Sequence, residues 1–296
     1  NAALIESSKH FAKDLMLKHG VPTATSMTFE SYSEAIGYIQ KSPMPVVVKA
    51  DGLASGKGVS VANTRREASD VISRYMEQKQ LGSAGQRILI EEYMSGREVS
   101  VFAFVDKEYV SPMVAACDYK RVGEGDVGPN TGGMGSYSPT SLWTENLESQ
   151  VRQEIMEPVV KALNAMGRPY QGILYAGLML TSEGPKVVEF NCRLGDPEAQ
   201  VILPRLKTDL GEVMMRTVQG RLQGLSLEWD ESACVGVVLA SGGYPDAYSM
   251  GYPVEGLGEL DEGISVFHAG TRRVLGEDFK SGEIVTDGGR VLTLSA

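Results

Sequence analysis

The sequence predicts a mixed α/β fold, of the α+β kind, that ends in a small, mostly β segment. Capping boxes open amphipathic helices over residues 31–41 and 64–78, and these helices alternate with short strands rich in β-branched residues. A polar dipeptide, Asp106-Lys107, separates two strand patterns and predicts an antiparallel hairpin. Beyond about Gly220, short strands separated by glycine and proline turns replace the helices.

Length and composition exclude several classes of protein. With 296 residues, the chain can fold as two or more domains. A formal net charge of −10 argues against a nucleic-acid partner, so local Lys and Arg side chains would have to meet an anionic ligand. Cys117, Cys192 and Cys234 show no paired spacing, which indicates a reduced, cytoplasmic compartment. No apolar run reaches the roughly 20 residues of a membrane span, so we expect no membrane partner.

Helix and strand signals follow one another along the chain. Residues 4–19 predict one helix, which Gly20 and Pro22 stop. Apolar residues at every fourth position over 147–163 predict a long amphipathic helix, which Pro158 would kink. Strands are predicted at residues 45–49, 59–62, 88–91, 98–105, 109–114, 172–180 and 187–192, and in the C-terminal segment at 234–240, 264–268 and 291–294.

The strongest functional signal lies in residues 187–198. The first half predicts a strand, and because strand side chains alternate between faces, Glu189, Asn191 and Arg193 share one face. A carboxylate, an amide oxygen and a guanidinium are costly to bury without partners, which Mg²⁺ and a nucleotide would supply. Arg193 offers a fork for phosphate or carboxylate. A surface strand with a salt bridge is the alternative interpretation of these three residues alone.

A glycine-rich loop, residues 50–58, joins two predicted strands. It is not a P-loop, because its glycine spacing is one residue short, no Ser or Thr follows Lys57, and no helix follows the loop. A strand–loop–strand flap can still close over phosphates with its backbone N–H groups. Lys49 and Lys57 favour this flap over the alternative, a plain hairpin with a flexible tip.

A second long loop, residues 118–136, carries six glycines and shows no periodic pattern. Loops of this length in compact domains are usually functional or disordered. Lys120 and Arg121 beside Asp118 suggest a site for anionic and amino-bearing ligands. A mobile linker is the alternative that composition alone supports.

Several of these stretches carry a family resemblance. Residues 189–198 resemble the magnesium strand of the ATP-grasp enzymes. Their tail, residues 195–198, and the flap at 48–59 are similar to those of the glycinamide ribonucleotide synthetase (phosphoribosylamine–glycine ligase) family, and residues 130–135 resemble its substrate loop. The resemblance covers essentially the whole chain in family order and lacks the family's N-terminal domain. Because the chain begins with Asn1 and leads directly into a predicted helix, we expect a piece of a longer protein.

The resemblance implies an ATP-grasp fold, in which two α+β subdomains clasp ATP, plus a small, mostly β C-terminal domain. The ATP-grasp core with the metal site would comprise residues 1–22 and 94–220. Residues 23–93 would form the lid subdomain with the flap, and residues 221–296 the C-terminal domain. That last segment shows no obvious catalytic cluster, so a purely structural role is the favoured interpretation.

The resemblance also implies roles for individual residues. The residues that would bind ATP are Lys9, Lys49, the hinge Glu91, Glu92, Tyr93 and Met94, the ribose-binding Glu98, and also Arg121 and Asn130. Mg²⁺, or Mn²⁺, would be held by Glu189 and Asn191, because the strand before them lacks the further carboxylate that many ATP-grasp enzymes carry there. The catalytic residues would be Arg193 and Lys57, and the substrates would be bound by Asp118, Lys120 and Asp196.

The reaction that the resemblance implies is a ligation in de novo purine biosynthesis. ATP, glycine and 5-phosphoribosylamine would give glycinamide ribonucleotide, ADP and phosphate through a glycyl phosphate. The expected partners are therefore small molecules, neither nucleic acid nor membrane, and further purine-pathway enzymes fused in the parent chain remain an open alternative. Two other functions also stay open: another ATP-grasp ligase of the purine pathway, and a nucleotide-binding fragment that is inactive without its N-terminal domain.

Overall fold

The computed structural model describes residues 2–54, 58–125, 127–274 and 282–296. The chain divides into two compact units, each assembled from several segments. The first unit comprises Asn1–Met113, Thr144–Arg193 and Gly211–Leu225. The second unit comprises Val114–Trp143, Leu194–Leu210 and Ser226–Ala296. The chain thus crosses between the units several times, and the domain boundaries predicted from the sequence remain predictions.

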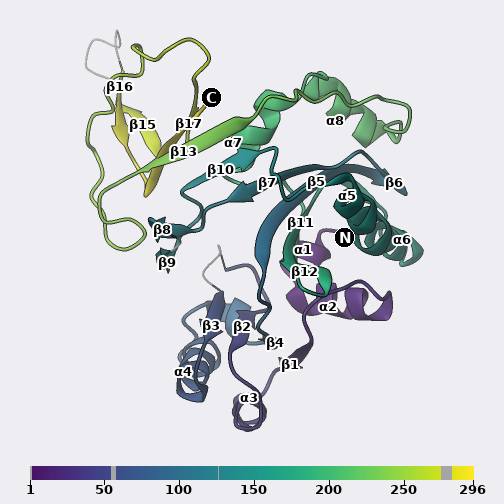
Figure 1. The fold of residues 1–296 in the computed structure, drawn as a ribbon. Coiled ribbons are helices and arrows are strands. Elements are labelled where there is room, and N and C mark those ends of the chain that lie inside the picture. Colours follow the sequence, from purple (N-terminus) through teal and green to yellow (C-terminus); the bar gives the residue numbers. More distant parts are fainter. Residues whose placement is uncertain (1, 55–57, 126, 275–281) are drawn as a thin grey trace. The chain divides into compact units, whose positions relative to one another are not determined.

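One half of the first unit is a four-stranded antiparallel sheet that we call the lid sheet (Figure 1). Its strands follow the order β1, β4, β2, β3, with bounds Ser26–Phe29, Ile88–Glu92, Val46–Ala50 and Val59–Ala62. Helices α3 (Tyr32–Ile39) and α4 (Arg65–Met76) pack on the sheet, and Ile39, Ile72 and Ile90 are among the buried residues between them. The strands predicted at 45–49, 59–62 and 88–91 and the helices predicted at 31–41 and 64–78 are confirmed, whereas β1 was not predicted.

The other half of the first unit is the core sheet, with strand order β12, β11, β5, and β6 paired to β5. The strand bounds are Gly184–Asn191 for β12, Tyr170–Thr181 for β11, Arg97–Lys107 for β5 and Tyr109–Val110 for β6. Its helices are α1 (Leu4–Ser7), α2 (Lys9–Lys18), α5 (Glu145–Val151), α6 (Glu157–Ala165) and α8 (Leu210–Gln219). Helix α6 contacts β5, β11 and α2, and α1 contacts β12.

The predicted long helix at 147–163 is interrupted by a π turn, Arg152–Met156, between α5 and α6. Pro158 is the second residue after this turn, in the first turn of α6. Because proline has no N–H to donate, the preceding carbonyls cannot keep the regular α-helical ladder, and the wider turn is one way to accommodate them. The helix is thus irregular just ahead of Pro158, and the kink expected at Pro158 itself remains a prediction.

Three sequence predictions are wrong in detail. The single helix expected over 4–19 is two helices, because Ser8 is extended and its hydroxyl accepts the N–H of Phe11 as the N-cap of α2. The strand expected over 109–114 pairs with β5 only at its first two residues. The loop expected over 118–136 contains a short hairpin, strands β8 (Arg121–Gly123) and β9 (Val127–Asn130).

The second unit contains a sheet with strand order β7, β10, β13, β17, β14, whose bounds are Val114–Asp118, Gly135–Ser138, Cys234–Ala240, Arg290–Ser295 and Ser265–His268. Helix α7 (Ala199–Ile202) packs on one face, where Val201 meets Gly236. Strands β15 (Thr271–Val274) and β16 (Glu283–Thr286) form a separate two-stranded antiparallel sheet. The mostly β character predicted for the C-terminal segment is confirmed.

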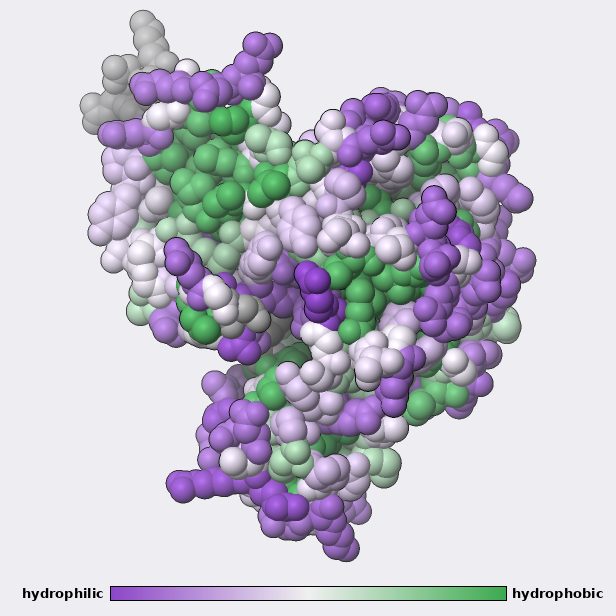
Figure 2. All heavy atoms as spheres, in the orientation of Figure 1, coloured by the Kyte–Doolittle hydropathy of each residue, from purple (hydrophilic) through white to green (hydrophobic). Residues whose placement is uncertain are grey.

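The face of this sheet opposite α7 is apolar and partly exposed. Val235, Val237 and Leu239 alternate with Gly236 along β13 and are 44–56% exposed. Figure 2 shows this area as green surface over β13 and β17 within the second unit. In the described part of the chain, no helix combines the length and apolar character needed to cross a bilayer.

Candidate functional site

A cavity in the first unit gathers most of the charged residues that the sequence singled out. Three segments line it: helices α1 and α2, the lid sheet at the base of the flap, and the end of strand β12. Between apolar walls that include Met16, Leu53 and Phe190, the cavity presents the ionisable side chains of Glu6, Lys9, Lys13, Lys49, Glu91, Glu189 and Arg193. Lysines, an arginine and carboxylates around one apolar-walled cavity can bind a polyanion together with a cation.

Strand β12 places Glu189 and Asn191 in this cavity, and Arg193 lines it as well. The register with β11 slips between Gly177 and Leu178, so Val188 has no partner of its own and also reaches the cavity. Strand β12 ends at Asn191, so Arg193 reaches the cavity from the bend that follows, not by strand alternation. Glu189, Asn191 and Arg193 thus line one cavity, but Val188 and Phe190 line it too, and the roles expected for the three polar residues remain predictions.

Glu6 on helix α1 fixes this bend. Its Oε2 accepts a hydrogen bond of 2.9 Å from the backbone N–H of Cys192, and its Oε1 lies 3.6 Å from Nε of Arg193. The Arg193 side chain is still 58% exposed, so it can contact a ligand in the cavity. Glu6 therefore orients the guanidinium without enclosing it.

A buried carboxylate lies between two lysines at the back of the cavity. Glu91 on β4 is 2% exposed, and its two oxygens lie 3.2 Å from Nζ of Lys13 and 2.9 Å from Nζ of Lys49. Lys49 also donates to the carbonyl of Val188, 3.0 Å away, next to the predicted metal ligand Glu189. This cluster joins the lid sheet to the core sheet within the first unit and holds one more positive charge than negative.

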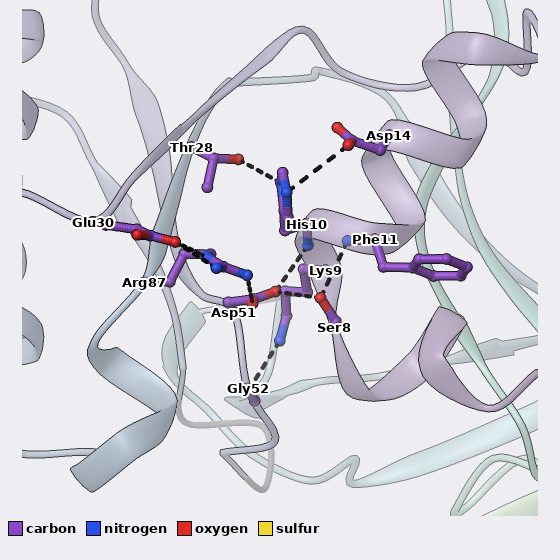
Figure 3. Close-up of polar contacts among 10 residues, drawn as sticks. All are labelled: Ser8, Lys9, His10, Phe11, Asp14, Thr28, Glu30, Asp51, Gly52 and Arg87. Atoms are coloured by element: carbon purple, nitrogen blue, oxygen red, sulfur yellow. Dashed lines mark hydrogen bonds and ion pairs between the residues drawn. The ribbon is translucent and has the colours of Figure 1, made fainter. Parts of the chain in front are cut away.

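The base of the flap is fastened to the start of helix α2 (Figure 3). Asp51 Oδ1 accepts hydrogen bonds from the hydroxyl of Ser8 at 3.0 Å and from the backbone N–H of His10 at 2.8 Å. Both partners flank Lys9, whose Nζ lies 3.5 Å from the carbonyl oxygen of Gly52. Asp51 also pairs with Arg87 at 3.4 Å. The predicted catalytic residue of the flap, Lys57, lies outside the described residues.

Burial shifts the protonation of two cavity lysines. Removal from water lowers the pKa of Lys9, against the attraction of Glu189. The same cause lowers the pKa of Lys13 to about 8, although Glu91 opposes the shift. A polyanion bound beside these lysines would raise the pKa of both, because a nearby negative charge favours the ammonium.

The oxygen donors fit a hard cation that keeps much of its coordination for ligand and water. Glu189 and Asn191 offer a carboxylate and an amide oxygen within the same cavity. In the described ranges, no cluster of three or more His, Cys, Asp or Glu side chains is arranged as a metal cage. Mg²⁺ is usually bound by one or two carboxylates together with phosphate oxygens of the substrate and water, and seldom by protein ligands alone. One carboxylate and one amide oxygen therefore fit Mg²⁺.

The hinge residues divide into two groups. Glu91 pairs with Ser26 on one side and Val47 on the other, which commits its backbone to the lid sheet, and its side chain lines the cavity. Glu92, Tyr93, Met94 and Glu98 are described, but they do not line this cavity. The Glu92 carboxylate accepts the backbone N–H of Thr25 at 2.9 Å, which lowers the Glu92 pKa. The roles expected for these four residues remain predictions.

The remaining predicted site residues belong to the second unit: Asp118, Lys120, Arg121, Asn130 and Asp196. The β8–β9 hairpin brings Arg121 opposite Asn130, and Arg121 donates to the carbonyl of Gly128 at 2.8 Å. The carboxylate of Asp196 pairs with Arg290 at 3.0 Å and accepts Gln200 Nε2 at 2.9 Å. Arg290 also donates to the carbonyl of Gly132, so it connects Asp196 to the predicted substrate loop.

Sequence reasoning missed Glu6, Lys13, Asp51 and Arg290. One signal was available for Lys13, because a spacing of four residues places it on the same helix face as Lys9. The burial pattern of α2 agrees, since Lys13 falls in the stripe of Ala12, Leu15 and Met16. The other three act through partners distant in the sequence, for which local patterns give no signal.

Comparison with known proteins agrees with this geometry. Residues 7–199 match the model of the phosphoribosylglycinamide synthetase ATP-grasp (A) domain, and residues 234–296 match that of the C domain. Phosphoribosylamine–glycine ligase of Halalkalibacterium halodurans is 49% identical over 294 residues, which cover 99% of this chain and 67% of that protein. The crystal structure of phosphoribosylamine–glycine ligase from Thermotoga maritima superposes with a TM-score of 0.88 at 33% identity, covering all of this chain and 72% of that one.

A more distant structure resembles the chain in fold alone. It is the biotin carboxylase domain of 2-oxoglutarate carboxylase from Hydrogenobacter thermophilus, with a TM-score of 0.69 at 17% identity, covering 99% of this chain and 62% of that one. A lid sheet and a core sheet that enclose a lysine-lined cavity define the molecule as an ATP-grasp protein. The chain belongs to the phosphoribosylglycinamide synthetase family, whose members are also named phosphoribosylamine–glycine ligases.

Proposed function

We propose that the chain catalyses the ATP-dependent ligation of glycine to 5-phosphoribosylamine, with glycinamide ribonucleotide, ADP and phosphate as products. The single observation that supports this most is the meeting of Lys9, Lys49, Glu189, Asn191 and Arg193 in one cavity, within a chain of this family. They come from a helix, the lid sheet and the end of β12, and together they suit a magnesium nucleotide.

The chemistry required is the activation of a carboxylate. Glycine's carboxylate attacks the γ-phosphorus of ATP, the bond to ADP breaks, and a glycyl phosphate forms. The amine of phosphoribosylamine then attacks the carbonyl carbon of the glycyl phosphate. Phosphate leaves together with the former carboxylate oxygen that bridged carbon and phosphorus, and the nitrogen loses a proton. Phosphoryl transfer of this kind depends on positioning and charge neutralisation more than on covalent help from the protein.

The residues of the cavity divide these tasks. Lys9 and Lys49 neutralise phosphate oxygens, and Arg193, oriented by Glu6, stabilises charge on the transferring phosphoryl group and on the tetrahedral intermediate. Glu189 and Asn191 would hold Mg²⁺, or Mn²⁺, which when bound neutralises and orients the phosphates. We assign Lys57 of the flap to the same charge neutralisation, and closure of the flap would keep water from the acyl phosphate.

The remaining predicted roles complete the proposal. The hinge residues and Glu98 would bind the adenosine, Arg121 and Asn130 the phosphates, and the glycine ammonium would lie near Asp118, Lys120 and Asp196. Asp196 already has Arg290 and Gln200 as partners, but a carboxylate accepts about four hydrogen bonds, so an ammonium can share it. We further propose the domain boundaries given above, small-molecule partners only, and a cytoplasmic location.

The test is the release of phosphate and ADP by the purified chain with Mg·ATP, glycine and freshly formed phosphoribosylamine. Release that requires both co-substrates is the expected result. A panel of other carboxylates and amines tests for a different purine-pathway ligase. Because the chain spans about two thirds of the relatives' length, the same assay includes a nucleotide-binding control. Binding of Mg·ATP without glycine-dependent phosphate release would identify a nucleotide-binding module and contradict the ligase proposal.

A further inference from the structure

Lys13 lines the cavity, yet protein groups outside its own helix hold its ammonium. It is 3% exposed, and its Nζ donates to Thr23 Oγ1 at 2.6 Å and to the carbonyl of Ala24 at 3.0 Å. The third neighbour of the ammonium is Glu91 Oε1 at 3.2 Å. This last contact is an ion pair and not a hydrogen bond, because Glu91 Oε1 accepts no hydrogen bond among the described residues. Two of the three N–H donors of Lys13 are therefore engaged by protein acceptors, and charge attraction holds the ammonium beside Glu91.

Lys49 lies across the same carboxylate and differs in this respect. Its Nζ contacts the other oxygen of Glu91 at 2.9 Å and donates to the carbonyl of Val188 at 3.0 Å. Among the described residues, Lys49 thus has one protein hydrogen bond and one ion pair, where Lys13 has two hydrogen bonds and one ion pair, and Lys49 also lines the cavity. The two lysines share one buried carboxylate, and protein acceptors hold Lys13 more firmly than Lys49.

The Lys13 contacts also reach strand β12. Thr23, which accepts from Lys13, donates its own hydroxyl to the carbonyl of Val187 at 2.7 Å. Val187 in turn donates its N–H to Pro22 at 2.8 Å. Lys13 thus connects helix α2, the carboxylate on the lid sheet and the strand that presents Glu189, all within the first unit.

We propose that Lys13 is a positioning residue of the nucleotide site: it holds Glu91 so that Lys49 directs one N–H toward the nucleotide. This inference rests on the proposed nucleotide-binding function of the cavity and assigns Lys13 no ligand contact. Without Lys13, Glu91 Oε1 loses the cation that lies 3.2 Å away, and of the two lysines that the described residues place beside this carboxylate only Lys49 remains. Lys49 would then turn toward Glu91 and away from the phosphates.

The test measures the binding of Mg·ADP, with no catalytic step, by isothermal titration calorimetry. The variants are Lys13→Met, Lys49→Met and the double variant, with Lys18→Met as the control because Lys18 is an exposed lysine on the same helix. We expect each single cavity variant to weaken Mg·ADP about tenfold, on the scale of one lost charged hydrogen bond. The double variant should bind no more weakly than Lys49→Met, since Lys13 acts through Lys49. Lys18→Met should bind like the wild type.

Non-additivity separates positioning from general destabilisation, which would add to the loss from Lys49→Met. If Lys13→Met does not fold, Lys13→Gln keeps an amide donor for Thr23 and removes the charge, and the same comparison applies. Additive losses, or unchanged Mg·ADP binding after Lys13 substitution, would overturn the inference. A wild-type chain that binds no nucleotide would overturn both this inference and the proposed function, whereas binding without ligase activity would overturn only the latter.

Discussion

At the scale of single residues, the cavity shows how one helix can carry lysines of different purpose. Lys9 and Lys13 lie one turn apart on the same face of α2, and burial lowers the pKa of both. Lys9 reaches the base of the flap at Gly52, whereas Lys13 is enclosed by protein acceptors. Sequence spacing could show that both ammonium groups face one way, but only the partners distinguish their roles.

Arg193 should affect turnover far more than nucleotide binding. Substitution to alanine removes the guanidinium that meets charge developing on the transferring phosphoryl group, so we expect turnover to fall by about 10²–10³-fold. Mg·ADP affinity should change by less than about threefold, because Lys9, Lys49 and the metal ligands remain. Steady-state kinetics and calorimetry measure the two effects. Arg216→Ala on α8, which removes an exposed ion pair with Glu212, is the control. Unchanged turnover for Arg193→Ala would reject its role.

Nucleotide binding should take up protons at alkaline pH. Burial lowers the pKa of Lys13 to about 8, so the ammonium is largely charged at pH 7 and increasingly neutral above pH 8. A polyanion favours the charged form, so it raises the pKa, and the complex binds protons that the free protein has lost. The affinity for the nucleotide should therefore fall as pH rises above 8. The lowered pKa of Lys9 should contribute to the same fall.

Calorimetry in two buffers with different ionisation enthalpies, at pH 7.0 and 8.5, measures this uptake. We expect almost no uptake at the lower pH and a clear fraction of a proton at the higher pH. Lys13→Met should reduce that fraction. Proton release at pH 8.5 would mean that the ligand does not approach these lysines.

At the scale of secondary-structure elements, the sequence predicted those features that depend on contacts between residues close together in the chain. The helix starts at Ser31 and Thr64 are confirmed, because each side chain accepts an N–H three residues further along its own helix. The break at Ser8 was not predicted, because it depends on Asp51, which is 43 residues away. The short β8–β9 hairpin was also missed, because its glycine-rich strands carry no apolar alternation.

Asp51 should contribute to stability through helix α2. Substitution to alanine leaves the N–H of His10 and the hydroxyl of Ser8 without their acceptor, and it removes one partner of Arg87. We expect a loss of about 1–2 kcal/mol in the free energy of unfolding, the range of a helix cap. Urea unfolding measures it. Asp70→Ala, an exposed position on α4, should change stability by less than about 0.5 kcal/mol. Equal stabilities of the two variants would contradict the anchoring role of Asp51.

At the scale of the whole molecule, the sequence motifs identified the family, and the structure supplied the connections among them. Strand alternation was enough to place Glu189 and Asn191 together, since period-two geometry is independent of tertiary context. It could not show that a register slip admits Val188, that Glu6 holds the bend before Arg193, or that Glu91 turns its carboxylate toward two lysines. Each of these features depends on residues from another segment.

In the second unit too, the sequence predicted the separate segments but not the residue that contacts both of them. Asp196 and the loop around Gly132 were each predicted as substrate-binding segments, and Arg290, from the last strand, contacts both. Arg290→Ala should therefore raise the KM for glycine several-fold and leave Mg·ADP binding unchanged, because its partners are the predicted glycine-binding segments. Initial rates at varied glycine concentration measure the effect. A shift in Mg·ADP affinity with an unchanged KM for glycine would place these segments in nucleotide binding instead.

The most direct test of the central claim is a crystal structure of the chain with a Mg·ATP analogue and glycine. The claim predicts Mg²⁺ bound by Glu189 and Asn191, with phosphate oxygens within hydrogen-bond distance of Lys9 and Lys49. It also predicts that Lys13 keeps its contacts with Thr23, Ala24 and Glu91. A nucleotide bound elsewhere, or phosphates that leave Glu189, Asn191 and Lys49 without contact, would contradict it.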